Sequence, residues 1–189
     1  MSVHLVLGGA RSGKSSHAER IAKRVSQPKQ SSDTKKTLHY IATALAFDEE
    51  MKSRIKHHQQ QRGTEWQEHE VPVKLTSYIE RFGAEDVVLI DCLTLWLNNV
   101  IFDLGDAVTE CKVKQTIDQW VEALAQSSAT IVLVSNEVGL GVIPLGEVSR
   151  LFVDHAGWMN QKIASIASRV EFIAAGLPLT LKPQPQSQS

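Results

Sequence analysis

The residue pattern with the clearest chemical meaning is a glycine-rich segment near the start of the chain. Residues 8–15 follow the pattern G-x-x-x-x-G-K-S, in which glycines let successive backbone N–H groups converge on phosphate oxygens. The lysine of this pattern contacts the β and γ phosphates, and the serine hydroxyl binds Mg²⁺. The sequence therefore predicts a nucleotide-binding loop made of Gly8, Gly9, Ala10, Arg11, Ser12, Gly13, Lys14 and Ser15, with Lys14 also catalytic.

The segments on both sides of the loop favour this interpretation over a glycine-rich turn that fits the pattern by chance. Residues 3–7 form an apolar run typical of a strand, and residues 16–25 are rich in helix formers with one apolar face. A helix that begins near Gly13 directs the positive end of its dipole at a bound phosphate. The loop thus has the strand before it and the helix after it that phosphate binding requires.

Two further polar sites follow apolar runs. Asp91 ends the run of residues 86–91, which is the position of the acid that supports Mg²⁺ in this class of enzyme. An alternative role for Asp91 is to cap the next helix. Residues 136–139, Asn-Glu-Val-Gly, follow the apolar run of residues 130–135 and either contact nucleotide or substrate or form a simple turn.

Adjacent histidines, His57 and His58, are the most unusual local feature. They lie in a polar segment, residues 48–61, that is expected to be helical, with Arg54, Lys56 and Arg62 close by. Neutral imidazole is a competent nucleophile toward phosphorus, and neighbouring cations depress its pKa and neutralise a triphosphate. A solvated polar helix without a chemical role is the alternative. Zinc is not expected, because helical metal-binding pairs favour an i, i+4 spacing.

The composition excludes several classes of function. With 189 residues, 42% of them hydrophobic, the chain fits one domain, residues 1–182, followed by a disordered tail, residues 183–189. The net charge of −1 removes the main argument for binding nucleic acid. Two cysteines without a CxxC pair indicate reduced thiols, and no run reaches the length of a membrane span. We expect a soluble, cytoplasmic protein with a small-molecule partner.

Alternating apolar runs and amphipathic segments predict an α/β fold with a mostly parallel sheet flanked by helices. In such folds ligands bind beyond the carboxyl ends of the strands. The runs at residues 3–7, 38–43, 86–91 and 130–135 are the expected strands, and residues 170–177 and 179–182 suggest a closing hairpin. The expected helices are residues 16–25, 48–61, 71–82, 110–126 and 151–168, with residues 93–100 either helix or loop.

With these residues assembled, the chain closely resembles the bifunctional adenosylcobinamide kinase / adenosylcobinamide-phosphate guanylyltransferase family, from end to end. The specific element is the histidine pair at its distance after the phosphate-binding loop. The other matching segments are residues 8–15, Tyr40 to Thr43, residues 48–51 with 54–58, Trp66 with Glu70, residues 136–139 with Pro144, and residues 152–157 with Asn160 and Gln161.

The resemblance implies two reactions. ATP or GTP phosphorylates the aminopropanol hydroxyl of adenosylcobinamide, and GMP is then transferred from GTP to that phosphate through a guanylylated histidine. It also implies Mg²⁺ as cofactor, a RecA-like P-loop fold, and a homotrimer with a site between subunits. The rival functions are a monofunctional P-loop small-molecule kinase and a GTP-binding regulatory module.

The resemblance also implies roles for individual residues. One of the two adjacent histidines is the nucleophile. His58 is preferred, and His57 is the adjacent alternative. Ser15 and Asp91 are the expected metal ligands. The implied nucleotide contacts outside the loop come from Thr43, Ala44, Leu45, Gln59, Gln60, Gln61, Arg62, Glu70 and Asp91. A carboxylate can accept hydrogen bonds from guanine N1–H and the exocyclic amine together, which favours GTP.

Overall fold

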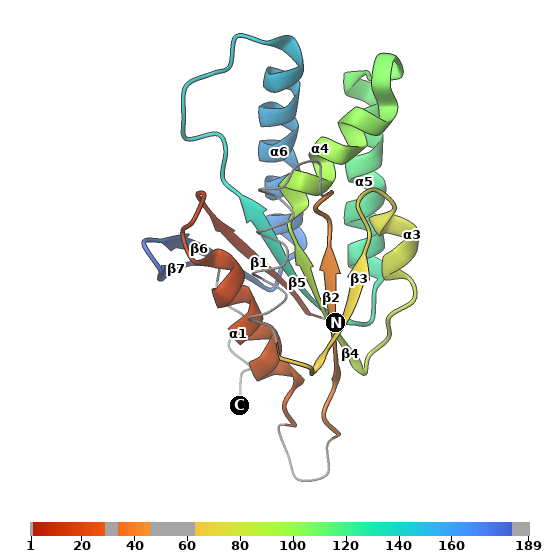
Figure 1. Ribbon diagram of the computed structural model, residues 1–189, viewed down its shortest axis with the longest axis vertical. Coiled ribbons are helices and arrows are strands. Elements are labelled where there is room, and N and C mark those ends of the chain that lie inside the picture. The colour runs from red at the N-terminus through yellow and green to blue at the C-terminus, as the bar shows by residue number, and fades with distance from the viewer. Residues whose placement is uncertain (1, 29–33, 46–62, 183–189) are drawn as a thin grey trace.

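A mostly parallel β-sheet organises the fold of the computed structural model, which describes residues 2–28, 34–45 and 63–182 (Figure 1). Among these residues, seven strands lie in the order β3-β2-β4-β5-β1-β6-β7. All neighbouring pairs are parallel except β6 and β7. The strands are β1 (Ser2–Gly8), β2 (Thr37–Ala42), β3 (Trp66–Glu70), β4 (Asp86–Asp91), β5 (Thr130–Asn136), β6 (Arg169–Ala174) and β7 (Leu177–Lys182).

Helices cover both faces of the sheet (Figure 1). One face packs against α1, where Ala18, Ile21 and Ala22 meet Leu89 and Val132. The other face carries the larger apolar cluster, whose members include the buried Trp96 and Trp120. The helices are α1 (Lys14–Ser26), α3 (Leu75–Ile79), α4 (Leu93–Leu104), α5 (Glu110–Gln126) and α6 (Glu147–Ile166), with a short 3₁₀ turn, η1 (Gly105–Ala107).

The predicted fold class is confirmed: an α/β fold with a mostly parallel sheet, flanking helices and a closing hairpin. One strand, β5, separates β1 from β4, the strand that ends in Asp91. The segment predicted as helix or loop after Cys92 is helical as far as Leu104. The last helix begins at Glu147, four residues before its predicted start. The predicted helix 48–61 and tail 183–189 lie outside the described residues.

The helix predicted for residues 71–82 is wrong at both ends. Only Leu75–Ile79 is helical, and Val73 and Lys74 precede it without regular structure. The strand just before it, β3, was not predicted, because Gln67, Glu68 and Glu70 are exposed and give no apolar run. An edge strand can be mostly polar, because much of it faces solvent. In β3 the buried side chain is Trp66, at the start of the strand.

The chain leaves β1 through a close backbone contact at Gly8. A Cβ at this position would lie 2.6 Å from the carbonyl oxygen of Ile173 on β6 and 2.6 Å from Ser12 Oγ. The turn between β6 and β7 reaches the same loop, since Gly176 N donates to Ser12 O at 2.9 Å. Ala175 and Gly176 both have positive φ, 50° and 79°, as the tight turn requires. The hairpin thus supports the phosphate-binding loop from the side.

Replacing Gly8 by alanine is expected to destabilise the protein by about 1–3 kcal/mol, because the new methyl group overlaps a backbone carbonyl in a packed region. The matched control is Gly9→Ala, since a Cβ there meets nothing within 4 Å. Its expected effect is within about 0.5 kcal/mol. Urea unfolding without nucleotide measures both. Equal destabilisation by the two variants would contradict the proposed contact.

Candidate functional site

The phosphate-binding loop has the backbone geometry that anion binding needs. Arg11 and Gly13 have positive φ, 55° and 91°, so the peptide groups between β1 and α1 turn inward. Lys14 begins α1 and is only 8% exposed. Its Nζ donates to Gly9 O at 3.1 Å, which folds the ammonium group back over the loop. The predicted loop residues therefore come together around one cradle, with the N-terminus of α1 behind it.

Asp91 lies at the carboxyl end of β4, two strands from the loop. The register pairs Asp91 with Val134 on β5, and the next two residues of β5 pair with Leu7 and Gly8. The pKa of the Cys92 thiol is raised to about 11, mainly by burial and next by the charge of Asp91, while the charge of Lys14 lowers it. Both charges thus act on one buried group at this edge.

The capping role considered for Asp91 is not observed. The N-cap of α4 is Cys92, and no side chain makes a cap hydrogen bond there. The Asp91 carboxylate is half-buried at the strand end rather than bound to the helix. The metal-supporting role stays a prediction.

Thr43 is fully buried and its polar groups are all engaged. The hydroxyl donates to Cys92 O at 2.7 Å and accepts from Cys92 N at 2.8 Å. Its backbone N–H donates to Asp91 O, and its carbonyl accepts from Asn99 Nδ2 at 2.8 Å. Thr43 therefore fixes the end of β2 against the end of β4. Ala44 and Leu45 remain the candidates in this turn for direct contact with nucleotide. That contact stays a prediction.

Glu70 ends β3, at the far edge of the same row of strand ends. It is exposed and pairs with Ala42, next to the Thr43 turn. Four strand intervals separate β3 from β1, which at ordinary spacing is about 19 Å. That separation is comparable to an extended nucleoside triphosphate. The predicted guanine contact from Glu70 is compatible with this placement and remains a prediction.

Asn136 ends β5, and the residues after it lead into a turn that begins at Gly139 and contacts the loop. Glu137 N donates to Gly8 O at 3.1 Å, and Gly139 N donates to Glu137 Oε1 at 2.8 Å. Asn136 Nδ2 donates to Thr94 Oγ1 at 2.9 Å, while Asn136 Oδ1 is buried without a hydrogen-bond partner. The turn that was one alternative is therefore present and bonded to the loop, and the contact with nucleotide or substrate stays a prediction.

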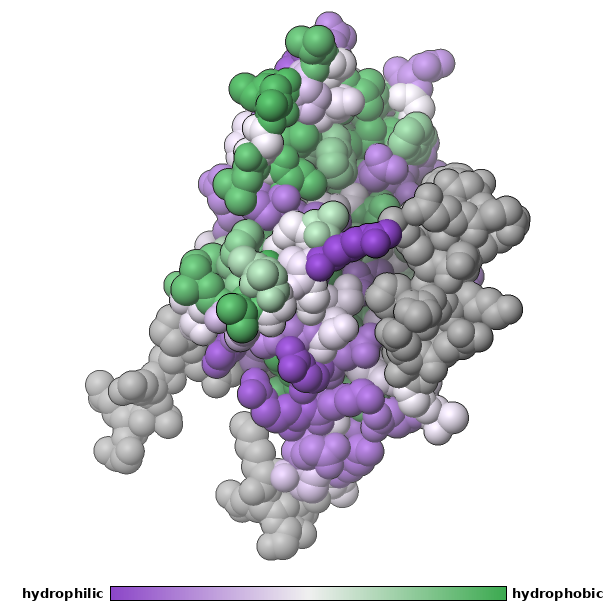
Figure 2. Space-filling view, turned by 60° about the vertical axis from the view of Figure 1, so that its left-hand side comes forward, coloured by the Kyte–Doolittle hydropathy of each residue, from purple (hydrophilic) through white to green (hydrophobic). Residues whose placement is uncertain are grey.

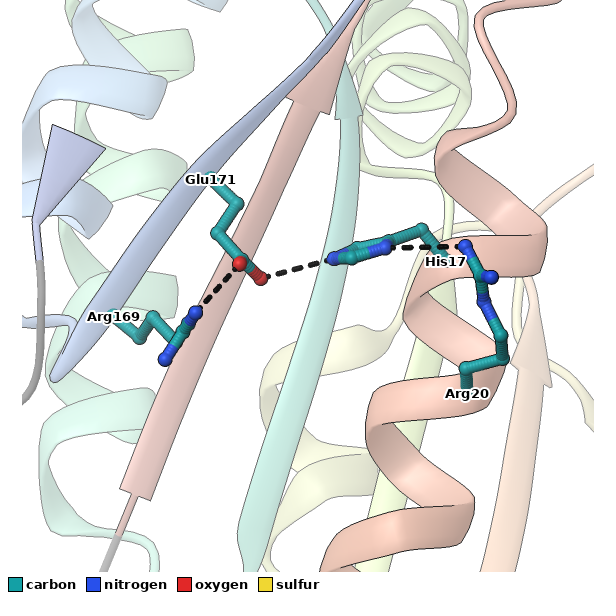
Figure 3. Close-up of polar contacts among 4 residues, drawn as sticks. All are labelled: His17, Arg20, Arg169 and Glu171. Atoms are coloured by element: carbon teal, nitrogen blue, oxygen red, sulfur yellow. Dashed lines mark hydrogen bonds and ion pairs between the residues drawn. The ribbon is translucent and has the colours of Figure 1, made fainter. Parts of the chain in front are cut away.

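A buried ion pair that was not predicted from the sequence links the first turns of α1 to β6. Figure 3 shows His17 on α1 reaching across to Glu171 on β6, with Nε2 and Oε2 3.1 Å apart. Arg169 donates to the other oxygen of Glu171 at 2.8 Å, and Arg20 Nη2 lies 3.4 Å from His17 Nδ1. A carboxylate only accepts, so His17 carries its proton on Nε2. The signal that could have found this pair is a glutamate inside the apolar strand 170–174.

Six predicted site residues, His57, His58, Gln59, Gln60, Gln61 and Arg62, lie outside the described residues. The described chain stops at Leu45, after the end of β2, and resumes at Gly63, before the start of β3, the strand that ends in Glu70. Within the described ranges, no group of three or more His, Cys, Asp or Glu side chains could hold a metal ion. In the same ranges no helix is both long and apolar enough to cross a membrane.

Comparisons with known proteins identify the family of the chain. A sequence model of the family described as cobinamide kinase / cobinamide phosphate guanyltransferase matches residues 4–181. The chain belongs to this family. The predicted resemblance is therefore confirmed.

Two relatives match nearly the whole chain. The bifunctional adenosylcobalamin biosynthesis protein CobP of Pseudomonas aeruginosa is 43% identical over 186 residues, covering 96% of this chain and 98% of the relative. The bifunctional adenosylcobalamin biosynthesis protein CobU of Escherichia coli is 35% identical over 188 residues, covering 94% and 98%. Among solved structures, a KaiC-like protein of Pyrococcus horikoshii matches with a TM-score of 0.47 and 12% identity, covering 90% of this chain and 70% of that one.

The ion pair predicts how stability depends on pH. Burial alone would raise the pKa of Glu171, but hydrogen bonds from Arg169 and His17 outweigh it and lower the pKa. A carboxyl group with a lowered folded-state pKa stabilises the protein above its unfolded pKa, and this contribution is lost as pH falls through the folded value. We expect Glu171→Gln to flatten the loss of stability between about pH 5 and pH 3.

Urea unfolding at several pH values measures this effect, with Glu80→Gln on the exposed end of α3 as the matched control. At pH 7 the Glu171 variant should be less stable by on the order of 1 kcal/mol. If the wild type and Glu171→Gln lose stability in parallel below pH 5, the ion pair has no such role.

Proposed function

We propose that the protein phosphorylates adenosylcobinamide with ATP or GTP and then transfers GMP from GTP to the product, giving adenosylcobinamide-GDP and pyrophosphate. Family membership over residues 4–181 carries this proposal. The relatives from P. aeruginosa and E. coli bear the name of a bifunctional protein of adenosylcobalamin biosynthesis. The formed phosphate-binding loop supports the nucleotide half of both reactions.

In the first reaction the loop binds the triphosphate. The backbone N–H groups around Gly13 and the N-terminus of α1 face the phosphates. Lys14 exchanges its bond to Gly9 O for the β and γ oxygens, and Arg11 stabilises the charge that develops as the γ-phosphoryl group leaves. The acceptor hydroxyl attacks phosphorus in line, and the bond to the β-phosphate oxygen breaks.

Ser15 and Asp91 are the residues that would hold Mg²⁺. A hydroxyl and a carboxylate at one edge of the sheet fit this ion, because it takes few protein ligands and completes its shell with phosphate oxygens and water. When bound, Mg²⁺ neutralises charge on the β and γ phosphates. The chain itself orients the two ligands through the start of α1 and the end of β4.

In the second reaction a histidine acts as nucleophile. A nitrogen of His58 attacks the α-phosphorus of GTP, a P–N bond forms, and the bond to the pyrophosphate oxygen breaks. An oxygen of the corrinoid phosphate then attacks the same phosphorus and releases the imidazole. His57 is the adjacent alternative. Gln59, Gln60, Gln61 and Arg62 contact the phosphates, and Ala44, Leu45 and Glu70 contact the nucleoside.

Two further features belong to the same proposal. The protein is a homotrimer, which is supported by an exposed apolar segment between β5 and α6: Leu140 is 80% exposed, Val142 96% and Leu145 97%. Its location is the cytoplasm, which is supported by two free cysteines, Cys92 and Cys111.

The covalent step predicts that GTP labelled at the α-phosphorus leaves acid-labile, base-stable label on the protein. We expect His58→Ala to abolish labelling, because the nucleophile is removed, and His57→Ala to retain it. His155→Ala, at a buried position of α6, is the control for loss of another histidine. Full labelling in both His57→Ala and His58→Ala would overturn the covalent mechanism.

Chromatography of adenosylcobinamide, its phosphate and its GDP adduct tests the whole function. A monofunctional kinase would stop at the phosphate without releasing pyrophosphate, and a regulatory module would bind GTP and leave the corrinoid unchanged. We expect all three corrinoids to appear in succession.

A further inference from the structure

A groove of about 410 Å³ lies between α6 and the β6–β7 hairpin. Gly157, Asn160, Gln161 and Ala164 line it from α6, at spacings that place them on one helix face. The small side chains of Gly157 and Ala164 leave the space open. Across from them, Leu7, Val170 and Leu181 give the groove an apolar wall.

One buried polar atom of the groove has no partner in the described part of the chain. Asn160 is only 6% exposed, yet its Oδ1 has no hydrogen-bond partner in the described part of the chain. A buried polar atom without a partner is costly, and native proteins usually pair such atoms with protein, water or ligand. Gln161 adds a second, exposed carboxamide, and Glu137 adds a carboxylate. Lys182 also lines the groove, and its ammonium group donates to Ala164 O and Ser165 O. The groove thus combines an apolar wall with amide groups, one carboxylate and one ammonium group.

The groove begins beside the phosphate-binding loop. Leu7 directly precedes Gly8, and Glu137 N donates to Gly8 O at 3.1 Å. The strand order places β6 and β7 on one side of β1, whereas β2 and β3 lie on the other side. The proposed nucleoside contacts, Ala44, Leu45 and Glu70, all belong to the β2–β3 side. The groove is therefore on the flank that the nucleotide leaves free.

We propose that this groove binds the periphery of the corrin ring of the acceptor. The ring carries methyl groups and carboxamide arms, which match the apolar wall and the carboxamides of Asn160 and Gln161. The groove holds one edge of the macrocycle, and the arm that ends in the hydroxyl extends past Glu137 to the loop. This inference rests on the proposed function, because it names where that function's acceptor binds.

The surface around the groove has the character expected for such a ligand. Figure 2 brings this side of the molecule forward and shows hydrophobic side chains gathered in separate patches. On β7, Leu177 is 73% exposed and Leu179 60%. They continue the apolar wall of Leu181 along the edge strand, so a macrocycle larger than the groove would still lie against apolar surface.

The test compares Asn160→Leu and Gln161→Leu with Gln119→Leu, a glutamine on the exposed face of α5. The kinase reaction is followed at saturating GTP with adenosylcobinamide varied. We expect KM for adenosylcobinamide to rise on the order of tenfold in each groove variant, because each loses hydrogen bonds to the ligand. KM for GTP and labelling by GTP alone should stay within about twofold of the wild type, and Gln119→Leu should leave all three values unchanged.

Binding of the ring is measured separately with a corrinoid that lacks the aminopropanol hydroxyl, used as a competitive inhibitor. Its inhibition constant should rise with KM in the groove variants. Gln161 is exposed, so Gln161→Leu keeps the proposal testable if Asn160→Leu does not fold.

Several results would overturn the inference. Unchanged KM for adenosylcobinamide in a folded variant would exclude the groove as the acceptor site. A rise in KM for GTP instead would assign it to the nucleotide, and a change in sedimentation without a change in KM would assign it to a subunit contact. Failure of the proposed function gives a different result. In that case the wild-type protein would take label from GTP but leave adenosylcobinamide unchanged.

Discussion

The arrangement of the site depends on the contact between Gly8 and the carbonyl of Ile173. With no side chain at Gly8, β1 and β6 remain paired up to the point where the loop begins. The β6–β7 turn can then reach Ser12 and hold the far end of the same loop. The loop is thus supported by β1, α1 and the hairpin before any nucleotide binds, which reduces the ordering cost of binding.

Parallel pairing of the strands brings several site residues to the edge of the sheet where the loop lies. Because β1, β2, β4 and β5 run in one direction, Gly8, Thr43, Asp91 and Asn136 all come at the same edge of the sheet. Thr43 links two of these strand ends through Cys92, and Glu137 links a third to Gly8. The buried pair of His17 and Glu171 connects α1 to β6 below the loop. These polar contacts therefore hold the strand ends and α1 in place around the loop.

The sequence was informative where one local pattern determines structure. The loop, its flanking strand and helix, and the apolar strands follow from glycine spacing and from buried parallel strands that read as continuous apolar runs. It was uninformative where structure depends on distant partners. The segment of β3 is a strand because it pairs with β2, and its own polar residues do not indicate one. The partners Glu171 and His17 are 154 positions apart in the sequence. Thr43 likewise resembled a ligand contact in sequence, whereas its partners come from β4 and α4.

The strand order also bears on how one loop can serve two reactions. Phosphoryl transfer needs an acceptor near the γ-phosphorus, and guanylyl transfer needs a nucleophile near the α-phosphorus. In the proposed function the base contacts residues at or after the ends of β2 and β3, so the acceptor would approach the γ-phosphorus from the side of β1 and β6. In the proposed arrangement the corrinoid stays on the β6–β7 flank of the loop, and the nucleoside lies on the β2–β3 flank. The acceptor and the nucleoside then do not compete for space, because β1 lies between their strands.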